Sequence, residues 1–479
     1  MDAARSSGKL FAANLVVTAL GFLGIAYFAR ELGADQLGVF FLYQAIVELV
    51  SVVTNLGLNQ SIRKRISEGD DPGRFLTTGI LLKTVPLAVA ALVILALGGL
   101  INDYVGAEVV LYVVIAVPLR EFSEMIVQVI EGELRVGETA VIRLSRQFVW
   151  VASGVALIQY GLGVEAVIVG TYLGWSVKLG WGMVRRSTGF GRPSLDYAQS
   201  LFDFAKFSSI GHVSGYFYSW LDVIVIGYFL PPSAVAAYEV AWRVTEVFTI
   251  FSNAIGLSVF PQISRYHAEG DWDAIQDLIS RSLMPTVFIV IPAFAGTLLL
   301  SREVLRFTFG PEYTIAWLVL VVLAAEKLFQ ALRHILARSL DGIDRPNLSA
   351  FSTGVTLTLN VVLNLLLVPQ IGIVGGAVAT FVSFVVNALL NVYFVSRHLT
   401  IAPAYGQIGR LVVASAVMLL AVAGLRSFLI EVDTLLRLLF VVAAGAGIYA
   451  GLTLSNDDIR REILRYVPLP ERVTRPAEA

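Results

Sequence analysis

Long apolar stretches separated by short polar connections make up almost the whole chain. A membrane hydrocarbon core about 30 Å thick needs about 20 mostly apolar residues per helix. By this measure the pattern predicts an all-α polytopic membrane protein with about 14 transmembrane helices. The predicted spans lie near residues 10–29, 38–62, 76–100, 107–130, 139–160, 164–184, 203–229, 233–263, 279–300, 314–338, 347–368, 374–396, 408–428 and 434–454.

The positions of the basic residues predict the orientation of these spans. With the N-terminus in the cytoplasm, about 22 basic residues lie inside and about 5 outside, as expected if cytoplasmic loops carry the excess of Lys and Arg. The loop after the second span holds Arg63, Lys64 and Arg65, and the loop after the sixth holds Arg185 and Arg186. We therefore expect a multi-pass protein of the cytoplasmic (cell) membrane with both termini in the cytoplasm. The run 10–29 shows no clear cleavage site, so we interpret it as a retained helix rather than a signal peptide.

A faint internal repeat suggests how the helices are grouped. The segments that begin at Leu37 and Val235 both run through a long span and end in EGD, at 68–70 and 269–271. An offset of six helices keeps two copies in the same orientation, which predicts two parallel lobes around a central cavity. The expected lobes are 1–200 and 201–400, followed by two additional helices in 401–456 and a cytoplasmic tail in 457–479. Chance similarity between membrane helices is the alternative.

Composition narrows the possible chemistry further. The chain of 479 residues is 57% hydrophobic and 15% charged, has a net charge of −1 and contains no cysteine. These values exclude disulfides and thiol catalysis, and they give no basic field for nucleic acid. No P-loop motif occurs, and the four histidines form no HExxH motif or close pair. We therefore expect no metal, no cofactor and no enzymatic activity.

Charged residues within the fourth predicted span require an explanation. Arg120, Glu121 and Glu124 lie near its centre. The apolar residues of this span gain about 6 kcal/mol on insertion, whereas the three charges cost about 9 kcal/mol. On a helix they share one polar arc with Gln128 and Glu131, so this face needs partners or water. Arg120 and Glu124 are spaced i, i+4 and can pair with each other.

Similar polar faces occur on helices of both halves, and together they predict a water-filled cavity. Arginine binds phosphate bidentately, so the basic residues are candidates for binding a substrate anion. These candidates are Lys83, Arg120, Arg143, Arg146, Lys178, Arg243, Lys327 and Arg333. The candidates for ion coupling or for charge pairing are Glu121, Glu124, Asp222, Glu246 and Glu326. His212 is a candidate polar cavity or packing residue. For any single charge, an internal ion pair that holds helices together is an equally good explanation, and Arg243–Glu246 is an example.

Three segments resemble a known family. They are FARELGADQLGVFFLYQ (28–44), WLDVIVIGYFLPPSAVAAYEVAWR (220–243) and LTLNVVLNLLLVPQIGIVGGAVAT (357–380). Over essentially the whole length, the chain is similar to Wzx-type polysaccharide-biosynthesis flippases of the multidrug/oligosaccharidyl-lipid/polysaccharide exporter superfamily. In the third segment, Asn360 and Asn364 share a helix face, and interhelical hydrogen bonding is the preferred interpretation for them.

The resemblance implies an alternating-access transporter. Its substrate would be an oligosaccharide linked to a polyprenyl or dolichyl (di)phosphate, moved from the inner to the outer leaflet. Membrane lipids and the glycosyltransferases, polymerase or ligase of the same pathway would be its partners. A cation-coupled drug exporter and a lipid II-type flippase share the fold and remain alternatives. A membrane glycosyltransferase would need a large catalytic loop, and a scaffold would not need so many membrane charges.

Overall fold

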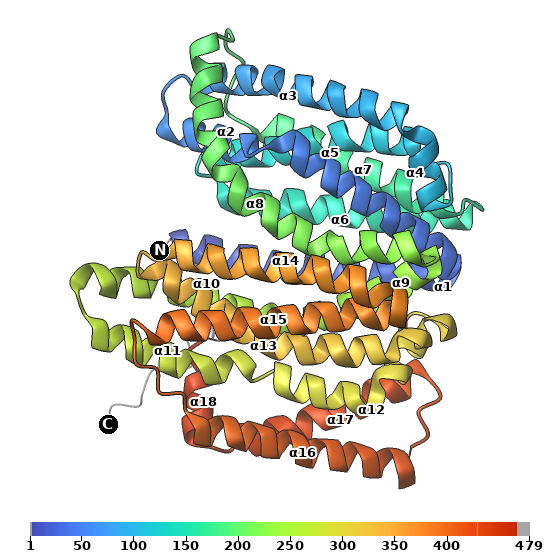
Figure 1. Ribbon diagram of the computed structural model, residues 1–479, viewed down its shortest axis with the longest axis vertical. Helices are drawn as coiled ribbons and strands as arrows, with labels where there is room; N and C mark the ends of the chain where they lie inside the picture. The colour runs from blue at the N-terminus through green and yellow to red at the C-terminus, as the bar shows by residue number, and fades with distance from the viewer. Residues whose placement is uncertain (1, 429, 467–479) are drawn as a thin grey trace. The chain divides into compact units, whose positions relative to one another are not determined.

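Every regular element among the described residues is a helix. The computed structural model describes residues 2–428 and 430–466, and for 2–12 and 207–219 it describes the backbone only (Figure 1). The His212 side chain therefore lies outside the described residues. The chain divides into two compact units, unit 1 (Met1–Glu239) and unit 2 (Val240–Ala479). The lobe boundary at 200/201 and the internal repeat of two parallel lobes remain predictions.

Among the residues that the structure describes, unit 1 contains eight helices and the first half of a ninth. They are α1 (Asp2–Asn55), α2 (Leu58–Glu68), α3 (Pro72–Ala96), α4 (Gly98–Val105), α5 (Val110–Gly132), α6 (Val136–Gln159), α7 (Val164–Arg185), α8 (Leu195–Phe229) and α9 (Pro232–Glu246). The long α1 is broken at Gly33, whose φ of 76° and ψ of 172° lie outside the helical region. Glycine adopts this positive φ without the steric cost that a Cβ imposes, so two spans follow each other without a loop.

Unit 2 begins within α9, and its described regular elements are likewise all helices. Its further elements are η1 (Val247–Thr249), α10 (Ile250–Glu269), α11 (Trp272–Val287), α12 (Val290–Thr308), η2 (Pro311–Ala316), α13 (Trp317–Gly342), α14 (Pro346–Ile371), α15 (Ile373–Ser396), α16 (Tyr405–Phe428), α17 (Leu435–Leu454) and α18 (Asp457–Leu464).

Helices lie in the predicted spans, although some spans, such as 38–62 and 279–300, contain two helices with a break between them, and the prediction of an all-α membrane protein is confirmed. Within the described residues, ten helical stretches are long and apolar enough to cross a membrane. An eleventh results if α4 and α5, which meet at 98°, form one broken span. The charged residues of α5 explain why it does not meet this criterion alone. The count of about 14 remains a prediction.

Small residues allow the helices of each unit to approach closely. In unit 1, a Cβ at Gly174 of α7 would lie 2.8 Å from the Arg146 carbonyl oxygen of α6. In unit 2, a Cβ at Gly375 of α15 would lie 2.5 Å from the Leu367 carbonyl of α14. Close packing of this kind is the main attraction between helices in lipid, where burial of apolar surface contributes little free energy. It fixes the backbone positions from which the polar side chains extend.

Candidate functional site

The charged face of α5 is the centre of a polar network in unit 1. This helix packs against α1, α2, α3, α6 and α7. Arg120 and Glu121 are buried at 8% and 1% exposure. A charge removed from water must be paired and hydrogen-bonded, so the neighbouring helices have to supply partners.

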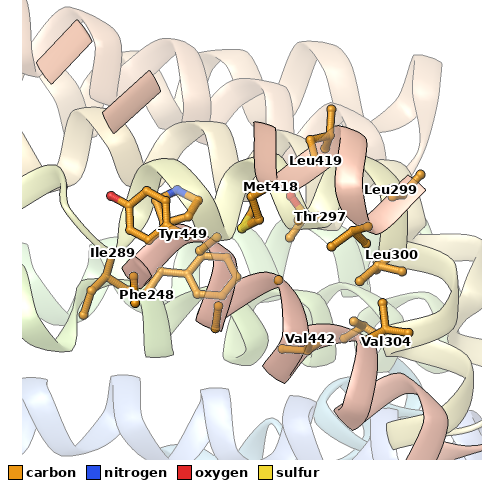
Figure 2. Close-up of a pocket in the computed structure, with 18 of the residues that line it drawn as sticks. Phe248, Ile289, Thr297, Leu299, Leu300, Val304, Met418, Leu419, Val442 and Tyr449 are labelled. Carbon is orange, nitrogen blue, oxygen red and sulfur yellow. The ribbon is translucent and has the colours of Figure 1, made fainter. Parts of the chain in front are cut away.

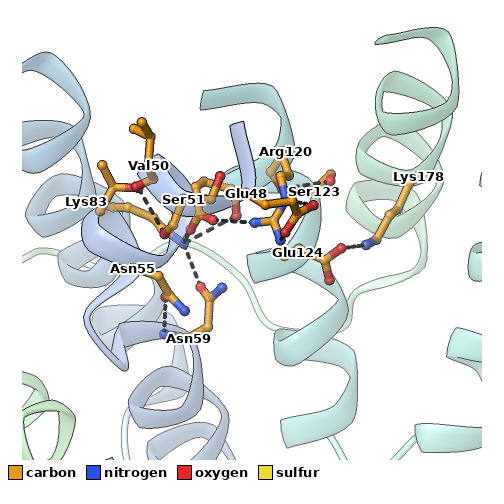
Figure 3. A network of polar contacts seen from close by, with 12 residues as sticks. Glu48, Val50, Ser51, Asn55, Asn59, Lys83, Arg120, Ser123, Glu124 and Lys178 are labelled. Atoms are coloured by element: carbon orange, nitrogen blue, oxygen red, sulfur yellow. Dashed lines mark hydrogen bonds and ion pairs between the residues drawn. The ribbon is translucent and has the colours of Figure 1, made fainter. Parts of the chain in front are cut away.

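The deepest part of the network joins α1, α2, α3 and α5 (Figure 3). Lys83 Nζ lies 2.7 Å from Glu121 Oε2 and donates to Asn59 Oδ1 at 2.6 Å. Arg120 donates through Nε to Glu48 Oε1 at 2.9 Å and through Nη1 to Glu121 Oε1 at 2.8 Å. Two cations from two helices are thus neutralised by two carboxylates, and the whole group is almost closed to solvent.

A second group of charges links α5 to α6 and α7. Lys178 forms an ion pair with Glu124, and its side chain is almost fully buried. Arg146 donates to Gln147 Oε1 at 2.7 Å. In the part of the chain that the structure describes, Arg146 forms no ion pair with a carboxylate. It is therefore the candidate cation of unit 1 whose charge is least compensated by a direct contact.

A third group lies toward the C-terminal end of α5. Glu131 accepts from Arg143 Nη2 at 2.9 Å and from Arg63 Nη1 at 3.0 Å. The two guanidiniums share one carboxylate, so this group has a net positive charge.

A small polar cavity of about 70 Å³ lies beside the network. Its polar lining residues come from α1, α2 and α5, and they are Ser51, Asn55, Asn59, Gln60, Arg120, Glu121, Glu124 and Gln128. Such a lining can hold a few water molecules.

Unit 2 contains a smaller, partly buried cluster with the opposite charge balance, in which the Glu246 side chain is 47% exposed. Lys327 Nζ lies 2.9 Å from Glu246 Oε1 and 3.2 Å from Glu326 Oε2, so one cation serves two carboxylates. The ammonium also lies 4.0 Å from the centroid of the Trp242 ring. Both Lys327 and Glu326 are fully buried. Arg243 and Arg333 are half-buried on α9 and α13, the same two helices that carry Glu246 and Lys327.

Asparagine side chains connect α14 to α15. Asn360 donates to Thr380 at 3.1 Å, and Asn364 donates to the Asn360 carbonyl at 3.0 Å. From α15, Asn387 donates to Thr356 at 2.7 Å, and Asn391 donates to Asn387 Oδ1 at 2.8 Å. The contact with Thr380 supports interhelical hydrogen bonding for Asn360, whereas the described contact of Asn364 stays within α14.

Asp222 also has a direct partner. It accepts a hydrogen bond from Tyr238 Oη at 2.5 Å within unit 1, and it is 4% exposed.

Unit 2 also contains an apolar cavity of about 490 Å³ (Figure 2). It is lined by residues of α9, η1, α12, α16 and α17 and of the link between α11 and α12, among them Phe248, Met418 and Tyr449. Its lining is almost entirely hydrocarbon, so it suits an apolar group rather than a charged one.

Sequence reasoning found most of the charged residues and missed several of their partners. Glu48 was detectable as a charge within a predicted span. Arg63 was assigned to a loop, and Asn59 carries no charge to mark it. The i, i+4 spacing paired Arg120 with Glu124, whereas the structure pairs Arg120 with Glu48 and Glu121. Partners on other helices depend on packing and leave no signal in local spacing.

Comparison with known proteins identifies the family. The family model described as "Polysaccharide biosynthesis protein" matches residues 27–317, and the model "Lipid II flippase MurJ" matches residues 203–442. The "Probable low-salt glycan biosynthesis flippase Agl15" of Haloferax volcanii is 42% identical, over 98% of this chain and 100% of that relative. The "Probable flippase AglR" of the same organism is 28% identical, over 96% of this chain and 97% of that relative.

Solved structures share the fold. The structure "Lipid II flippase MurJ, inward closed conformation" has a TM-score of 0.78 at 15% identity and covers 95% of this chain and 100% of its own length. An outward-facing multidrug resistance MATE family transporter of the MOP superfamily has a TM-score of 0.56 at 14% identity, over 82% of this chain and 95% of its own length. The matched family model and the 42% identical relative together show that the chain belongs to the polysaccharide biosynthesis protein family of membrane proteins.

Proposed function

We propose that this protein is a flippase that moves an oligosaccharide linked to a polyprenyl or dolichyl (di)phosphate from the cytoplasmic to the outer leaflet. The relationship to a probable glycan biosynthesis flippase over nearly the whole chain supports this activity. The observation that carries it is the cationic network of unit 1. There Arg146 forms no ion pair among the described residues, and Arg63 and Arg143 share the single carboxylate of Glu131.

A bound anion compensates the excess positive charge of such a network in the membrane. Charged residues in a transmembrane segment are costly unless they pair or face water, and they mark the route of a charged substrate. The guanidinium group suits a phosphate because it donates two parallel hydrogen bonds. Arg120, Arg143, Arg146, Lys178 and Lys83 are the anion-binding candidates of unit 1. Arg243, Lys327 and Arg333 are those of unit 2.

The mechanism that we propose is alternating access between two six-helix lobes, with both termini in the cytoplasm. Glu121, Glu124, Asp222, Glu246 and Glu326 are candidates for ion coupling or for charge pairing. A membrane potential can also drive an anionic substrate, at about 2.3 kcal/mol per charge per 100 mV. The chain would have no enzymatic activity of its own. Glycosyltransferases that make the substrate, and a polymerase or ligase that consumes it, would be its functional partners.

The sidedness of the lipid-linked glycan tests this function. The gene is deleted, and sealed inside-out and right-side-out vesicles are treated with a membrane-impermeant glycosidase. We expect the precursor to accumulate and to be cleaved only from the cytoplasmic face. A strain that never makes the lipid-linked glycan would assign the protein to synthesis instead. Normal exposure of the glycan on the outer face, in a strain without a second flippase, would contradict the proposal and favour drug export.

A further inference from the structure

Glu131 holds two arginines that come from two other helices. Arg63 of α2 and Arg143 of α6 each donate one hydrogen bond to a different oxygen of its carboxylate. The Glu131 side chain is 8% exposed, whereas those of Arg63 and Arg143 are 54% and 43% exposed. The carboxylate is therefore buried beneath two guanidiniums that face outward.

The backbone packing around this group is tight, so the arrangement is built into the fold. A Cβ at Gly132 would lie 2.7 Å from the Arg63 carbonyl oxygen, which means that α2 rests directly on α5. Between α5 and α6, the side chains of Val127, Ile130 and Ile142 form a buried apolar cluster. Both arginines therefore extend from fixed positions on either side of Glu131.

The hydrogen-bonding capacity of the two guanidiniums is mostly unused. Each guanidinium has five N–H donors, and Glu131 engages one from each. Within the described residues, Glu131 is the only group to which Arg63 or Arg143 donates. One carboxylate compensates one of the two charges, so one positive charge remains, and the unused donors other than the buried Arg143 Nε–H are available to an anion.

The deeper cations of unit 1 differ from Arg63 and Arg143 both in how fully their charge is paired and in how exposed they are. Lys83, Arg120 and Lys178 are each in direct ion pairs, and their side chains are at most 9% exposed. They are closed to an arriving anion unless helices move. Arg146 lies one turn from Arg143 on α6. Arg63, Arg143 and Arg146 therefore form a series of positive charges that runs from the loop-side end of α5 toward the middle of α5.

We propose that Arg63 and Arg143, held together by Glu131, form the entry site at which the (di)phosphate group of a lipid-linked substrate first binds. This proposal rests on the proposed function. Two guanidiniums on either side of one carboxylate offer donors to the oxygens of both phosphates of a diphosphate. Glu131 sets their spacing and leaves one net positive charge, so the anion is held without being trapped. From there the phosphate passes to Arg146.

Binding to the purified full-length protein in lipid nanodiscs tests the entry site. The probe is a short-chain isoprenyl diphosphate, and the matching isoprenyl alcohol measures the contribution of the apolar chain alone. We expect Arg63→Gln and Arg143→Gln each to weaken diphosphate binding about tenfold, the loss expected for a charge-assisted hydrogen-bonding group. Each variant leaves Glu131 paired with the other arginine, so folding is preserved. Arg65→Gln is the matched control, because Arg65 also lies on α2 and pairs at the surface with Glu68.

Substitution of the carboxylate separates anion binding from a structural role. Glu131→Gln removes the competing negative charge, and we expect diphosphate binding to become severalfold tighter. A purely structural ion pair predicts no gain. The triple variant R63Q/E131Q/R143Q leaves no unpaired charge within this group, and we expect it to bind the diphosphate at least as weakly as the single arginine variants do.

Three results would overturn the entry site. One is wild-type affinity in both Arg63→Gln and Arg143→Gln. Another is unchanged or weaker binding in Glu131→Gln. The third is equal competition by inorganic pyrophosphate or by phosphatidylglycerol vesicles, which would indicate a general anion site. A different result would contradict the proposed function itself. In that case the wild-type protein would not expose the glycan on the outer face, whatever the arginine variants bind.

Discussion

Lys83 of α3 and Glu121 of α5 form an ion pair with an N–O distance of 2.7 Å, and their side chains are 0% and 1% exposed. Their attraction offsets the cost of burial only while both partners are present, because a lone buried charge is far more costly than a pair. Substitutions of Lys83 and Glu121 therefore test whether the polar network of unit 1 stabilises the fold.

We expect Glu121→Gln to lower the free energy of unfolding by about 3–5 kcal/mol, because it leaves the buried Lys83 ammonium without a carboxylate. The double variant K83M/E121Q should recover most of this loss. Thermal unfolding of the purified protein in detergent, followed by size-exclusion chromatography, measures both. Equal destabilisation in the single and double variants would contradict the pairing.

Arg146 should behave differently, because its described contact is with the neutral Gln147. We expect Arg146→Gln to leave the unfolding temperature nearly unchanged, since no carboxylate loses a partner. Transport of the lipid-linked glycan should fall about tenfold or more, because a phosphate-binding group is lost.

The measurement for Arg146 is glycan exposure in right-side-out vesicles, normalised to the amount of folded protein. Arg437→Gln is a suitable control, since Arg437 pairs with Asp433 near the exposed start of α17. A normal transport rate in Arg146→Gln would remove Arg146 from the candidate binding site.

The cluster in unit 2 predicts that two Lys327 variants differ in stability. Lys327→Met leaves Glu246 and Glu326 without their shared cation, and we expect a loss of about 3–5 kcal/mol. Adding Glu326→Gln removes the fully buried carboxylate, so K327M/E326Q should be more stable than K327M alone. Unfolding temperatures of the two variants decide the order. A double variant as unstable as K327M would mean that Glu326 is not paired with Lys327.

The contact between α6 and α7 can be tested with two glycines of the same helix. A Cβ at Gly174 would lie 2.8 Å from the Arg146 carbonyl oxygen, whereas one at Gly180 would meet nothing within 4 Å. We expect Gly174→Ala to destabilise the protein by about 1–3 kcal/mol through overpacking. Gly180→Ala should be neutral or up to about 1 kcal/mol stabilising, because alanine favours the helix. Thermal unfolding measures both variants, and equal effects would contradict the close approach.

The apolar pattern alone determined the helices of this protein. A helix satisfies its own backbone hydrogen bonds, and lipid offers no other partners for them. A run of about 20 apolar residues in lipid therefore forms a helix. The same reasoning identified Lys83, Arg120, Glu121, Arg146 and Lys178, since a charge in an apolar run is costly wherever it lies. The family resemblance was also carried by sequence, and the matched family model confirms it.

Only the tertiary structure decided which charges meet. Glu48 and Arg120 are 72 residues apart, as are many other pairs that do not touch, and nothing in their local spacing selects them. Their contact depends on how α1 packs against α5, and that packing is set by small residues and side-chain shape. The same holds for Arg63, a loop-side arginine that the close approach of α2 to Gly132 brings to Glu131. Local sequence fixes the hydrogen bonds within a helix, whereas the ion pairs between helices follow from packing, to which the whole chain contributes.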